Sequence, residues 1–259
     1  MALCIDINCD LGEGSTMSGG DDAVMPFITS ANIACGFHAG DPLTMEMTIR
    51  SAVMHGVAVG AHPGYPDRDG FGRRRMVGRS RAGPDRDELR AMILYQAAAL
   101  KGMTEAAGTR MMHVKPHGAL YNSAATDFEL SMIIAGAVKE LDSSLVLVGL
   151  SGSQIIRAAR ETGIACASEV FADRQYNDDG TLVSRDLPGA VIHDTGLMIQ
   201  RVIRMITEKT VVTVSGKIIP VEADTVCIHG DNESAPEFVR MLTSALKAEG
   251  IELRPPLNR

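Results

Sequence analysis

The sequence predicts an α/β protein, a single (β/α) barrel domain formed by residues 1–259. Short apolar runs alternate with longer segments that carry apolar residues at helical spacing, which is typical of a mostly parallel sheet. Nearly every apolar run ends in a polar motif, and the sites of such barrels are assembled from the carboxyl ends of several strands. No G-x-G-x-x-G motif follows the first run, which disfavours the competing architecture, an open doubly wound sheet.

Seven strands and six helices are expected from these patterns. The strands cover residues 3–8, 31–37, 57–61, 111–114, 145–150, 164–170 and 225–228. The helices cover residues 42–55, 85–107, 127–141, 153–162, 194–209 and 235–249. Four of these helices end just before a glycine, which is a common stop signal. Residues 211–221 break the alternation, because two short β-rich runs flank a Ser-Gly-Lys turn and predict a hairpin.

Composition excludes several classes of protein. The chain is 45% hydrophobic and 22% charged, as an average soluble domain is, and its 259 residues can bury a large core. A net charge of -7, 4% aromatic residues and no Trp argue against a nucleic-acid surface. The five cysteines form no C-x-x-C pair, which argues against a disulfide framework, and Cys9, Cys35, Cys166 and Cys227 are expected to be core residues. With no signal peptide and no apolar run near the roughly 18 residues of a membrane span, we expect a cytoplasmic protein without membrane contact.

Four of the seven histidines share one local setting. Each follows a short apolar run and is followed within two residues by glycine: His38, His62, His117 and His229. One such histidine would be interpreted as a residue that caps its own loop, but four at equivalent strand ends indicate the mouth of the barrel. Imidazole has an unperturbed pKa of about 6.5, which suits both proton transfer and metal binding near neutral pH.

Carboxylates accompany these histidines. Asp6, Asn8 and Asp10 alternate along the first expected strand and therefore lie on one of its faces. Burying such a series is costly unless it serves a polar site, so we expect it to face the barrel interior. Glu13 follows in the adjoining loop.

Lys115 lies between His113 and His117, so these three side chains are expected on one face of the fourth strand. A buried lysine usually has a lowered pKa or an acidic partner. We therefore expect Lys115 to stabilise an oxyanion, to bind a carboxylate or phosphate, or to pair with Asp10 or Glu169.

Several common mechanisms lack their motif in this chain. The sequence contains no Gly-x-Ser-x-Gly elbow, no G-x-x-x-x-G-K-[ST] phosphate loop and no His-Glu-x-x-His. Asp10, His38 and His62 form the best trio for a divalent cation with open positions for water. A metal-free acid–base cluster is the alternative.

Long and unusual motifs run from the first expected strand to the last. They are DINCDLGE at residues 6–13, SANIACGFHAGD at 30–41, GAHPGYPD at 60–67, GFGRR at 70–74, VKPHGALYN at 114–122, EVFADR at 169–174 and CIHGD at 227–231. In these motifs the chain resembles the LamB/YcsF family over essentially its whole length. Residues 14–20 differ from the family's usual continuation of the first motif.

The resemblance implies a seven-stranded (β/α) barrel related to glycoside hydrolases and polysaccharide deacetylases. It also implies the A subunit of an ATP-dependent 5-oxoprolinase, which converts 5-oxo-L-proline to L-glutamate and releases ADP and phosphate. ATP with Mg²⁺ and two partner subunits, B and C, would then be required. The alternatives are a stand-alone metal-dependent amidase or deacetylase, and a subunit that binds 5-oxoproline without catalysing its hydrolysis.

The candidate site residues fall into three groups. The catalytic candidates are Asp10, Lys115, His117 and His229, with Asp10 or a histidine as base and Lys115 holding negative charge. The substrate-binding candidates are Asn8, Asn32, Glu169, Arg74 and Arg174. The arginines among them suit a carboxylate or a phosphate. The candidate metal ligands are Asp10, His38 and His62.

Overall fold

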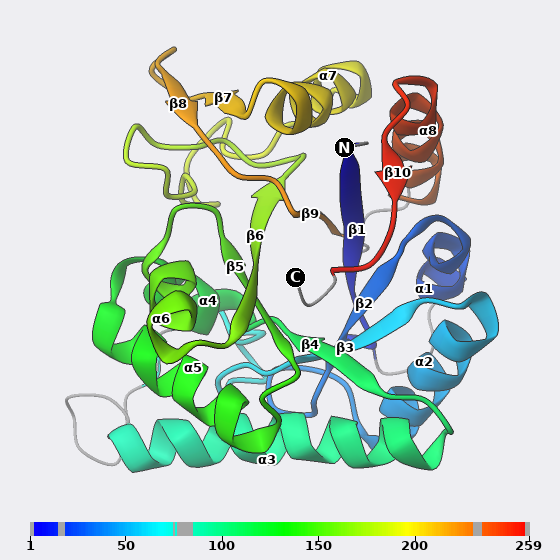
Figure 1. Ribbon diagram of the computed structural model, residues 1–259, viewed down its shortest axis with the longest axis vertical. Coiled ribbons are helices and arrows are strands. Elements are labelled where there is room, and N and C mark those ends of the chain that lie inside the picture. The colour runs from blue at the N-terminus through cyan, green and yellow to red at the C-terminus, as the bar shows by residue number, and fades with distance from the viewer. Residues whose placement is uncertain (1–2, 15–18, 75, 77–84, 230–234, 257–259) are drawn as a thin grey trace.

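Seven parallel strands form a closed barrel in the computed structural model, which describes residues 3–14, 19–74, 76, 85–229 and 235–256. The ring closes because β1 pairs with both β2 and β9. The strands follow one another around it as β1 (Cys4–Leu11), β2 (Ser30–Ala34), β3 (Ala58–His62), β4 (Met111–Val114), β5 (Val146–Leu150), β6 (Ala165–Phe171) and β9 (Thr225–His229). A short strand, β10 (Glu252–Leu253), also pairs with the start of β1. The predicted seven-stranded barrel is confirmed (Figure 1).

Helices surround this barrel (Figure 1). They are α1 (Gly19–Val24), the 3-10 turn η1 (Met25–Phe27), α2 (Pro42–His55), α3 (Arg86–Ala106), α4 (Gly118–Thr126), α5 (Phe128–Leu141), α6 (Gln154–Thr162), α7 (Thr195–Thr207) and α8 (Ala235–Ala248). The six predicted helices are confirmed to within two residues at each end. The short helices α1 and α4 were not predicted. Helix α4 begins directly after His117, inside a motif that we interpreted only as the polar end of a strand.

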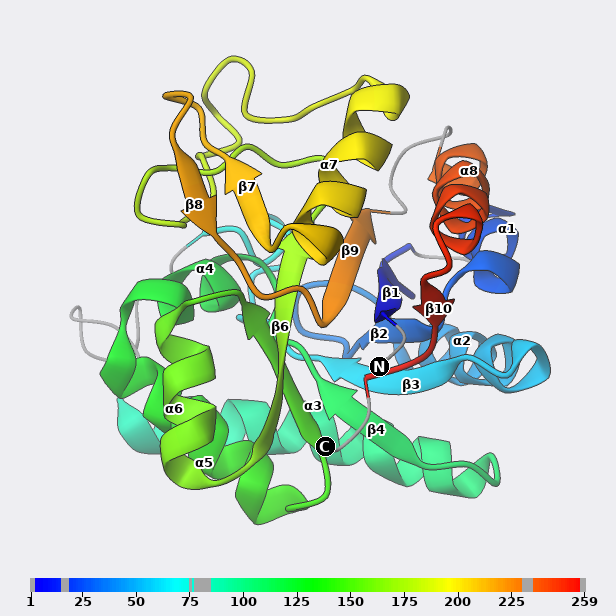
Figure 2. The same cartoon turned by 45° about the horizontal axis from the view of Figure 1, so that its top comes forward.

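The predicted hairpin is also present. Strands β7 (Thr210–Val212) and β8 (Ile218–Pro220) pair in antiparallel fashion. The hairpin lies in the connection from β6 to β9, beside α7 (Figure 2).

Side-chain caps explain where two of the long helices start. The carboxylate of Asp41 accepts hydrogen bonds from the backbone N–H groups of Leu43 and Thr44, both at 2.9 Å, at the start of α2. Asp85 and Glu88 form a reciprocal capping box at the start of α3. Such caps satisfy N–H groups that have no partner within the helix.

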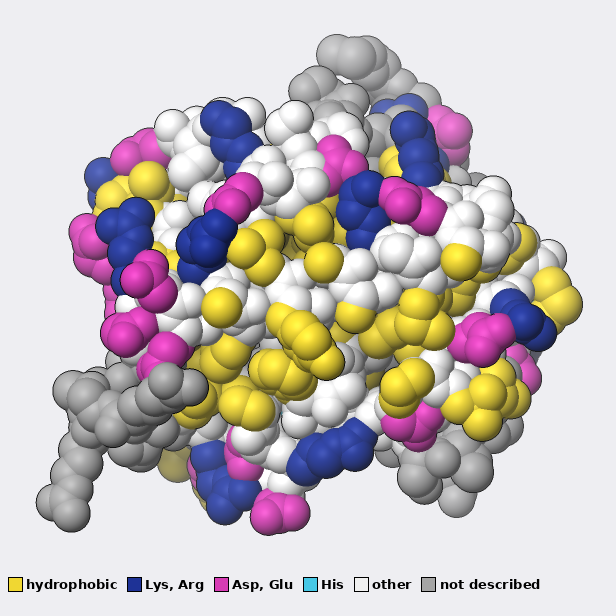
Figure 3. All heavy atoms as spheres, turned by 90° about the horizontal axis from the view of Figure 1, so that it is seen from below, with side chains coloured by type: hydrophobic (Ala, Val, Ile, Leu, Met, Phe, Trp, Pro, Cys, Tyr) yellow, Lys and Arg dark blue, Asp and Glu magenta, His cyan; other side chains and the backbone are white. Residues whose placement is uncertain are grey.

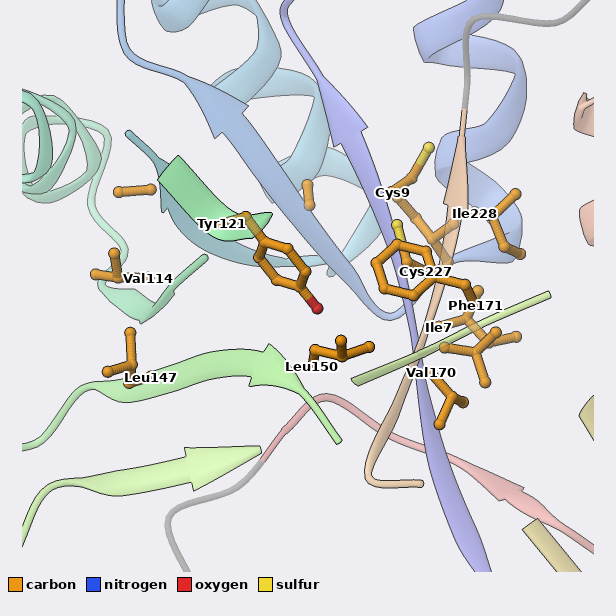
Figure 4. Packing of buried hydrophobic residues seen from close by; sticks show 14 of the residues in the cluster. Ile7, Cys9, Val114, Tyr121, Leu147, Leu150, Val170, Phe171, Cys227 and Ile228 are labelled. Carbon is orange, nitrogen blue, oxygen red and sulfur yellow. The ribbon is translucent and has the colours of Figure 1, made fainter. Parts of the chain in front are cut away.

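Apolar side chains fill the layer between the strands and the helices (Figure 4). Ile7 and Cys9 of β1 alternate with Asn8, and Ile228 of β9 packs in the same cluster. All five cysteines are free thiols, and Cys9, Cys35 and Cys227 are buried. The predicted core position is therefore confirmed for these three cysteines, whereas Cys166 is only partly buried.

The other face of β1 points into the barrel and is polar. Asp6 accepts hydrogen bonds from the hydroxyl groups of Thr29, Ser30 and Thr225 at 2.6, 2.8 and 2.5 Å. Burial raises the pKa of Asp6 to about 6 in spite of these donors. The predicted inward face of β1 is confirmed, and its cost is met by hydrogen bonds from neighbouring strands.

Gly60 allows an imidazole ring to cross the barrel. His113 of β4 lies opposite Gly60 of β3 in the sheet. The Nε2 atom of His113 lies 2.8 Å from Oδ1 of Asn32 on β2. A Cβ atom at position 60 would lie only 2.1 Å from this Nε2. No side chain therefore fits at position 60 unless the ring moves.

Apolar side chains also gather on one outer face of the barrel, the face of α2 and α3 that is seen from below in Figure 3. Leu43 and Met54 of α2 are 64% and 76% exposed, and Tyr95 of α3 is 66% exposed. Exposed apolar groups that gather on one face are typical of contact surfaces. No helix in the described part of the chain is long and apolar enough to cross a membrane.

We expect Gly60→Ala to lower the free energy of unfolding by about 1–3 kcal/mol, because the new methyl group overpacks the barrel against His113. Gly102→Ala in α3 is the matched control. Nothing lies within 4 Å of its added Cβ, so it should stabilise the helix by about 0.5–1 kcal/mol. Urea unfolding measures both changes, and equal stability of Gly60→Ala and the wild type would contradict the prediction.

Candidate functional site

The carboxyl ends of the strands open onto a cavity of about 540 Å³. The strand ends contribute Asp10, His62 and Lys115 to its lining. The loop from β6 to α7 contributes Arg174 and residues 181–186. The cavity thus combines rigid strand ends on one side with a long connection on another.

Lys115 is enclosed by two carboxylates. Its Nζ lies 2.9 Å from Oδ1 of Asp10 and 2.9 Å from Oε1 of Glu169, and it donates to Oδ1 of Asn8 at 3.0 Å. Burial disfavours the charged ammonium, but Asp10 and Glu169 outweigh burial and hold the pKa of Lys115 well above its usual value. The ammonium therefore stays protonated, and it pairs with both of the acids expected from the sequence.

Asparagine side chains hold this ion pair from below the cavity. Asn32 Nδ2 donates to Asn8 Oδ1 at 2.7 Å and to Asp10 Oδ1 at 2.8 Å. Asn8 Nδ2 donates in turn to Glu169 Oε1 at 2.9 Å. Asn8, Asn32 and Glu169 are at most 1% exposed. In the structure they position Asp10 and Lys115, and their predicted contact with a substrate stays a prediction.

A second cluster lies beside this network. Glu13, His38, His62 and His117 each offer one ligand atom, and the four atoms lie within 4.8 Å of one another. Glu13 Oε1 is 3.3 Å from His38 Nε2 and 3.4 Å from His117 Nδ1. His62 Nε2 is 2.9 Å from His117 Nδ1. The rings of His38 and His117 stack with their centroids 3.7 Å apart.

Backbone carbonyls decide which ring nitrogens carry hydrogen in this cluster. His62 Nδ1 lies 2.7 Å from the carbonyl oxygen of Lys115, and His117 Nε2 lies 2.8 Å from that of Phe71. A carbonyl only accepts, so both nitrogens donate. The lone pairs of His62 Nε2 and His117 Nδ1 then face each other at 2.9 Å, which requires either a shared proton or a cation between them.

The pKa values of the three histidines are shifted in different directions. Burial and the neighbouring His62 lower the pKa of both His38 and His117 to about 3. Burial also disfavours charge on His62, but Asp10, 3.3 Å from its Nε2, outweighs burial and raises its pKa above the usual value. A proton in this cluster therefore resides on His62, whereas neutral His38 and His117 can act as acceptors or metal ligands.

Phe71 presses the loop of residues 70–74 against these rings. Its ring lies edge-on to His38 and His117, with centroids 5.8 and 5.1 Å apart. Phe71 has φ 54, which is uncommon for a residue other than glycine. Strain of this kind is typical of functional sites whose surroundings enforce it.

The model of the LamB/YcsF family matches residues 5–259. The chain belongs to the LamB/YcsF family. It is 48% identical over 252 residues to the A subunit of 5-oxoprolinase from Acinetobacter baylyi, covering 96% of this chain and 97% of that protein. It is 50% identical over 253 residues to the corresponding 5-oxoprolinase chain from Geobacillus kaustophilus, covering 97% and 96%.

A solved structure supports the same fold for this LamB/YcsF chain. The crystal structure of the lactam utilization protein from Thermus thermophilus superimposes with a TM-score of 0.89 at 42% identity. The alignment covers 97% of this chain and 99% of that chain. The whole barrel, including the strand ends that carry the site, is therefore common to both proteins.

The LamB/YcsF site brings together some of the predicted residues and separates others. His38 and His62 lie together, Glu13 and His117 complete their cluster, and Asp10 contacts both His62 and Lys115. Arg74 is 66% exposed and pairs with Asp67 outside the cavity lining. The backbone of His229 pairs beside Asp10, and its side chain lies outside the described residues.

Sequence reasoning also missed Tyr121 of α4. Its ring packs edge-on against Phe171 with centroids 5.9 Å apart, and Figure 4 shows its hydroxyl pointing toward the middle of the barrel. Burial, together with the charge of Glu169, raises the pKa of this phenol well above its usual value. Tyr121 lies one helical turn after His117 within the motif of residues 114–122, and only a prediction of α4 would have placed it at the site.

We expect Lys115→Met to lower the free energy of unfolding by about 3–5 kcal/mol, because it leaves Glu169 buried without its ammonium partner. Adding Glu169→Gln should recover part of this loss by removing the buried charge. Urea unfolding at neutral pH compares the single and double variants. A double variant that is no more stable than Lys115→Met would contradict this account of the ion pair.

Proposed function

We propose that this LamB/YcsF chain is the lactam-opening subunit of an ATP-dependent 5-oxoprolinase. The observation that carries the proposal is the Lys115–Asp10 ion pair beside the Glu13–histidine cluster, within one cavity. The ammonium of Lys115 supplies a fixed positive charge, and Asp10 and the cluster supply proton acceptors, where an amide could bind. The names of the relatives, which refer to 5-oxoprolinase and to lactam utilization, support the choice of substrate.

Ring opening needs a base and a site for negative charge. A water oxygen adds to the lactam carbonyl carbon, and Asp10 or neutral His117 accepts the proton that the water loses. The ammonium of Lys115 stabilises the negative charge that develops on the carbonyl oxygen. The ring C–N bond then breaks, and the nitrogen takes up a proton to become an amine.

ATP is required because hydrolysis of an unstrained five-membered lactam is unfavourable at equilibrium. Phosphorylation of the amide oxygen would activate the carbon toward water. Cleavage of the C–N bond would then leave an acyl phosphate, and a second water would release phosphate and glutamate. This scheme requires ATP with Mg²⁺ and includes the partner subunits B and C. The chain itself contains no G-x-x-x-x-G-K-[ST] loop for the phosphates of ATP.

The four clustered residues also fit a divalent cation. Three imidazole nitrogens and one carboxylate oxygen suit Zn²⁺ and similar ions. His62 and His117 donate their outer N–H groups to backbone carbonyls, as metal-bound histidines commonly do. A bound ion would polarise the amide carbonyl or lower the pKa of a water molecule.

This cluster supports a second candidate function, a stand-alone metal-dependent amidase. Such an enzyme would hold its cation tightly and would hydrolyse a simple amide without ATP or partner subunits. Both candidates use the same cavity, so they differ in what they require rather than in where the reaction takes place.

We expect glutamate to form from 5-oxoproline only when this chain, its B and C partners, ATP and Mg²⁺ are all present. Each component is omitted in turn while glutamate is measured. Lys115→Met should reduce the rate by a factor on the order of 10² or more. Arg157→Gln on the exposed side of α6 should leave the rate unchanged. Hydrolysis of acetamide by this chain alone would favour the amidase, and full activity with Lys115→Met would favour a non-catalytic binding role.

We expect Glu13→Gln and His117→Ala to weaken the binding of a divalent cation by at least about 10-fold, because each removes one ligand from the cluster. Elemental analysis and Zn²⁺ titration against a chromophoric chelator measure the loss. His55→Gln, on the exposed end of α2, is the histidine control. A wild-type chain that binds no cation would leave the shared-proton form of the cluster as the working state.

A further inference from the structure

We propose that Arg174 binds the carboxylate of the substrate, so that the cavity accepts lactams that carry a carboxylate and rejects neutral lactams. This inference rests on the proposed function for the identity of the ligand. It adds the residue that binds the carboxylate group, which is remote from the reacting amide.

Arg174 is a buried cation that lines the cavity. It is only 6% exposed, and it belongs to the cavity lining together with Asp10 and Lys115. Its Nη2 donates to the backbone carbonyl of Val183 at 2.6 Å. Its Nε is buried and has no hydrogen-bond partner. Among the described residues, no carboxylate forms an ion pair with this guanidinium.

An arrangement of this kind is unfavourable until an anion arrives. A guanidinium carries five N–H donors, and burial without a counter-ion leaves them poorly satisfied. Burial, aided by the nearby charge of Arg185, lowers the pKa of Arg174 below its usual value. A carboxylate would supply both the missing charge and two parallel acceptors, which is the geometry that arginine binds best.

The loop holds Arg174 in place before any ligand binds. Isolated β-bridges join Arg174 to Val191 and Tyr176 to Leu182. The buried Tyr176 accepts a hydrogen bond through its hydroxyl oxygen from the backbone N–H of Phe171, at 2.9 Å. Because the loop is tied to the end of β6 in this way, the guanidinium is positioned in advance and little order is lost on binding.

Other arginines of the cavity are less suited to this role. Arg73 is exposed and lies over the ring of Phe71, 5.0 Å from its centroid. Arg185 is exposed as well. Exposed cations remain hydrated and discriminate weakly between ligands. Leu150, Phe171 and Leu182 line the same cavity and can contact the methylene groups of a lactam ring.

The test compares 5-oxoproline with its neutral carboxamide and with 2-pyrrolidinone, using titration calorimetry on the full chain. The wild type should prefer the carboxylate by a factor on the order of 10² or more, because the neutral ligands leave Arg174 unpaired. In Arg174→Gln this preference should fall to about 10-fold or less, mainly through weaker binding of 5-oxoproline. Arg174→Lys should show an intermediate preference, since lysine keeps the positive charge but lacks the two parallel N–H donors of the guanidinium. Arg73→Gln tests the rival arginine, and Arg157→Gln is the neutral control.

Thermal unfolding of the ligand-free proteins separates binding from folding. Removing an unpaired buried cation should leave Arg174→Gln at least as stable as the wild type, whereas loss of a purely structural arginine would lower the stability. If Arg174→Gln keeps the wild-type preference for the carboxylate, or if Arg73→Gln loses it instead, this inference is overturned and the proposed function stands. If the wild type binds none of the three ligands, the proposed function fails, and the inference fails with it.

Discussion

A charged lysine enclosed by a barrel needs compensation from several strands at once, and this need organises the whole site. The ammonium of Lys115 on β4 is held by Asp10 of β1 and Glu169 of β6, at 2.9 Å each. Those carboxylates are held in turn by Asn8 and Asn32. The polar interior of the barrel therefore forms one continuous hydrogen-bond network that supports the residues at its mouth. A substitution in one strand of this network alters the hydrogen bonds of the others.

The histidine cluster is built on top of this support. Burial alone would keep all of its imidazoles neutral, but Asp10 biases the proton toward His62. The backbone of Lys115 and the unusual conformation of Phe71 orient the outer nitrogens of His62 and His117. The inner nitrogens then converge on a point near Glu13, so the arrangement suits either proton transfer or a cation without further movement.

Much of the fold could be predicted from the sequence, because alternating apolar runs and helical spacing depend on neighbours along the chain. The inward face of Asp6, Asn8 and Asp10 was visible for the same reason. The grouping of side chains was less accessible. Glu13 and His117 reach the cluster only because a loop and an unpredicted helix start place them there. The pairing of Arg74 with Asp67 likewise depends on how one turn folds back, which no periodic pattern reveals.

The division between strand ends and the β6–α7 loop has a consequence for how such barrels diverge. The candidate reacting groups reside on segments whose substitution would disturb the packing of the entire barrel. Arg174 and its bridges reside on a connection outside the barrel wall, which hydrogen bonds tie to the end of β6, to α7 and to the β7–β8 turn. Natural variation in residues 172–194 could therefore alter which molecules are admitted while the chemistry stays intact. Under the proposed function, a duplicated gene would need substitutions in this connection alone for its product to accept a different substrate.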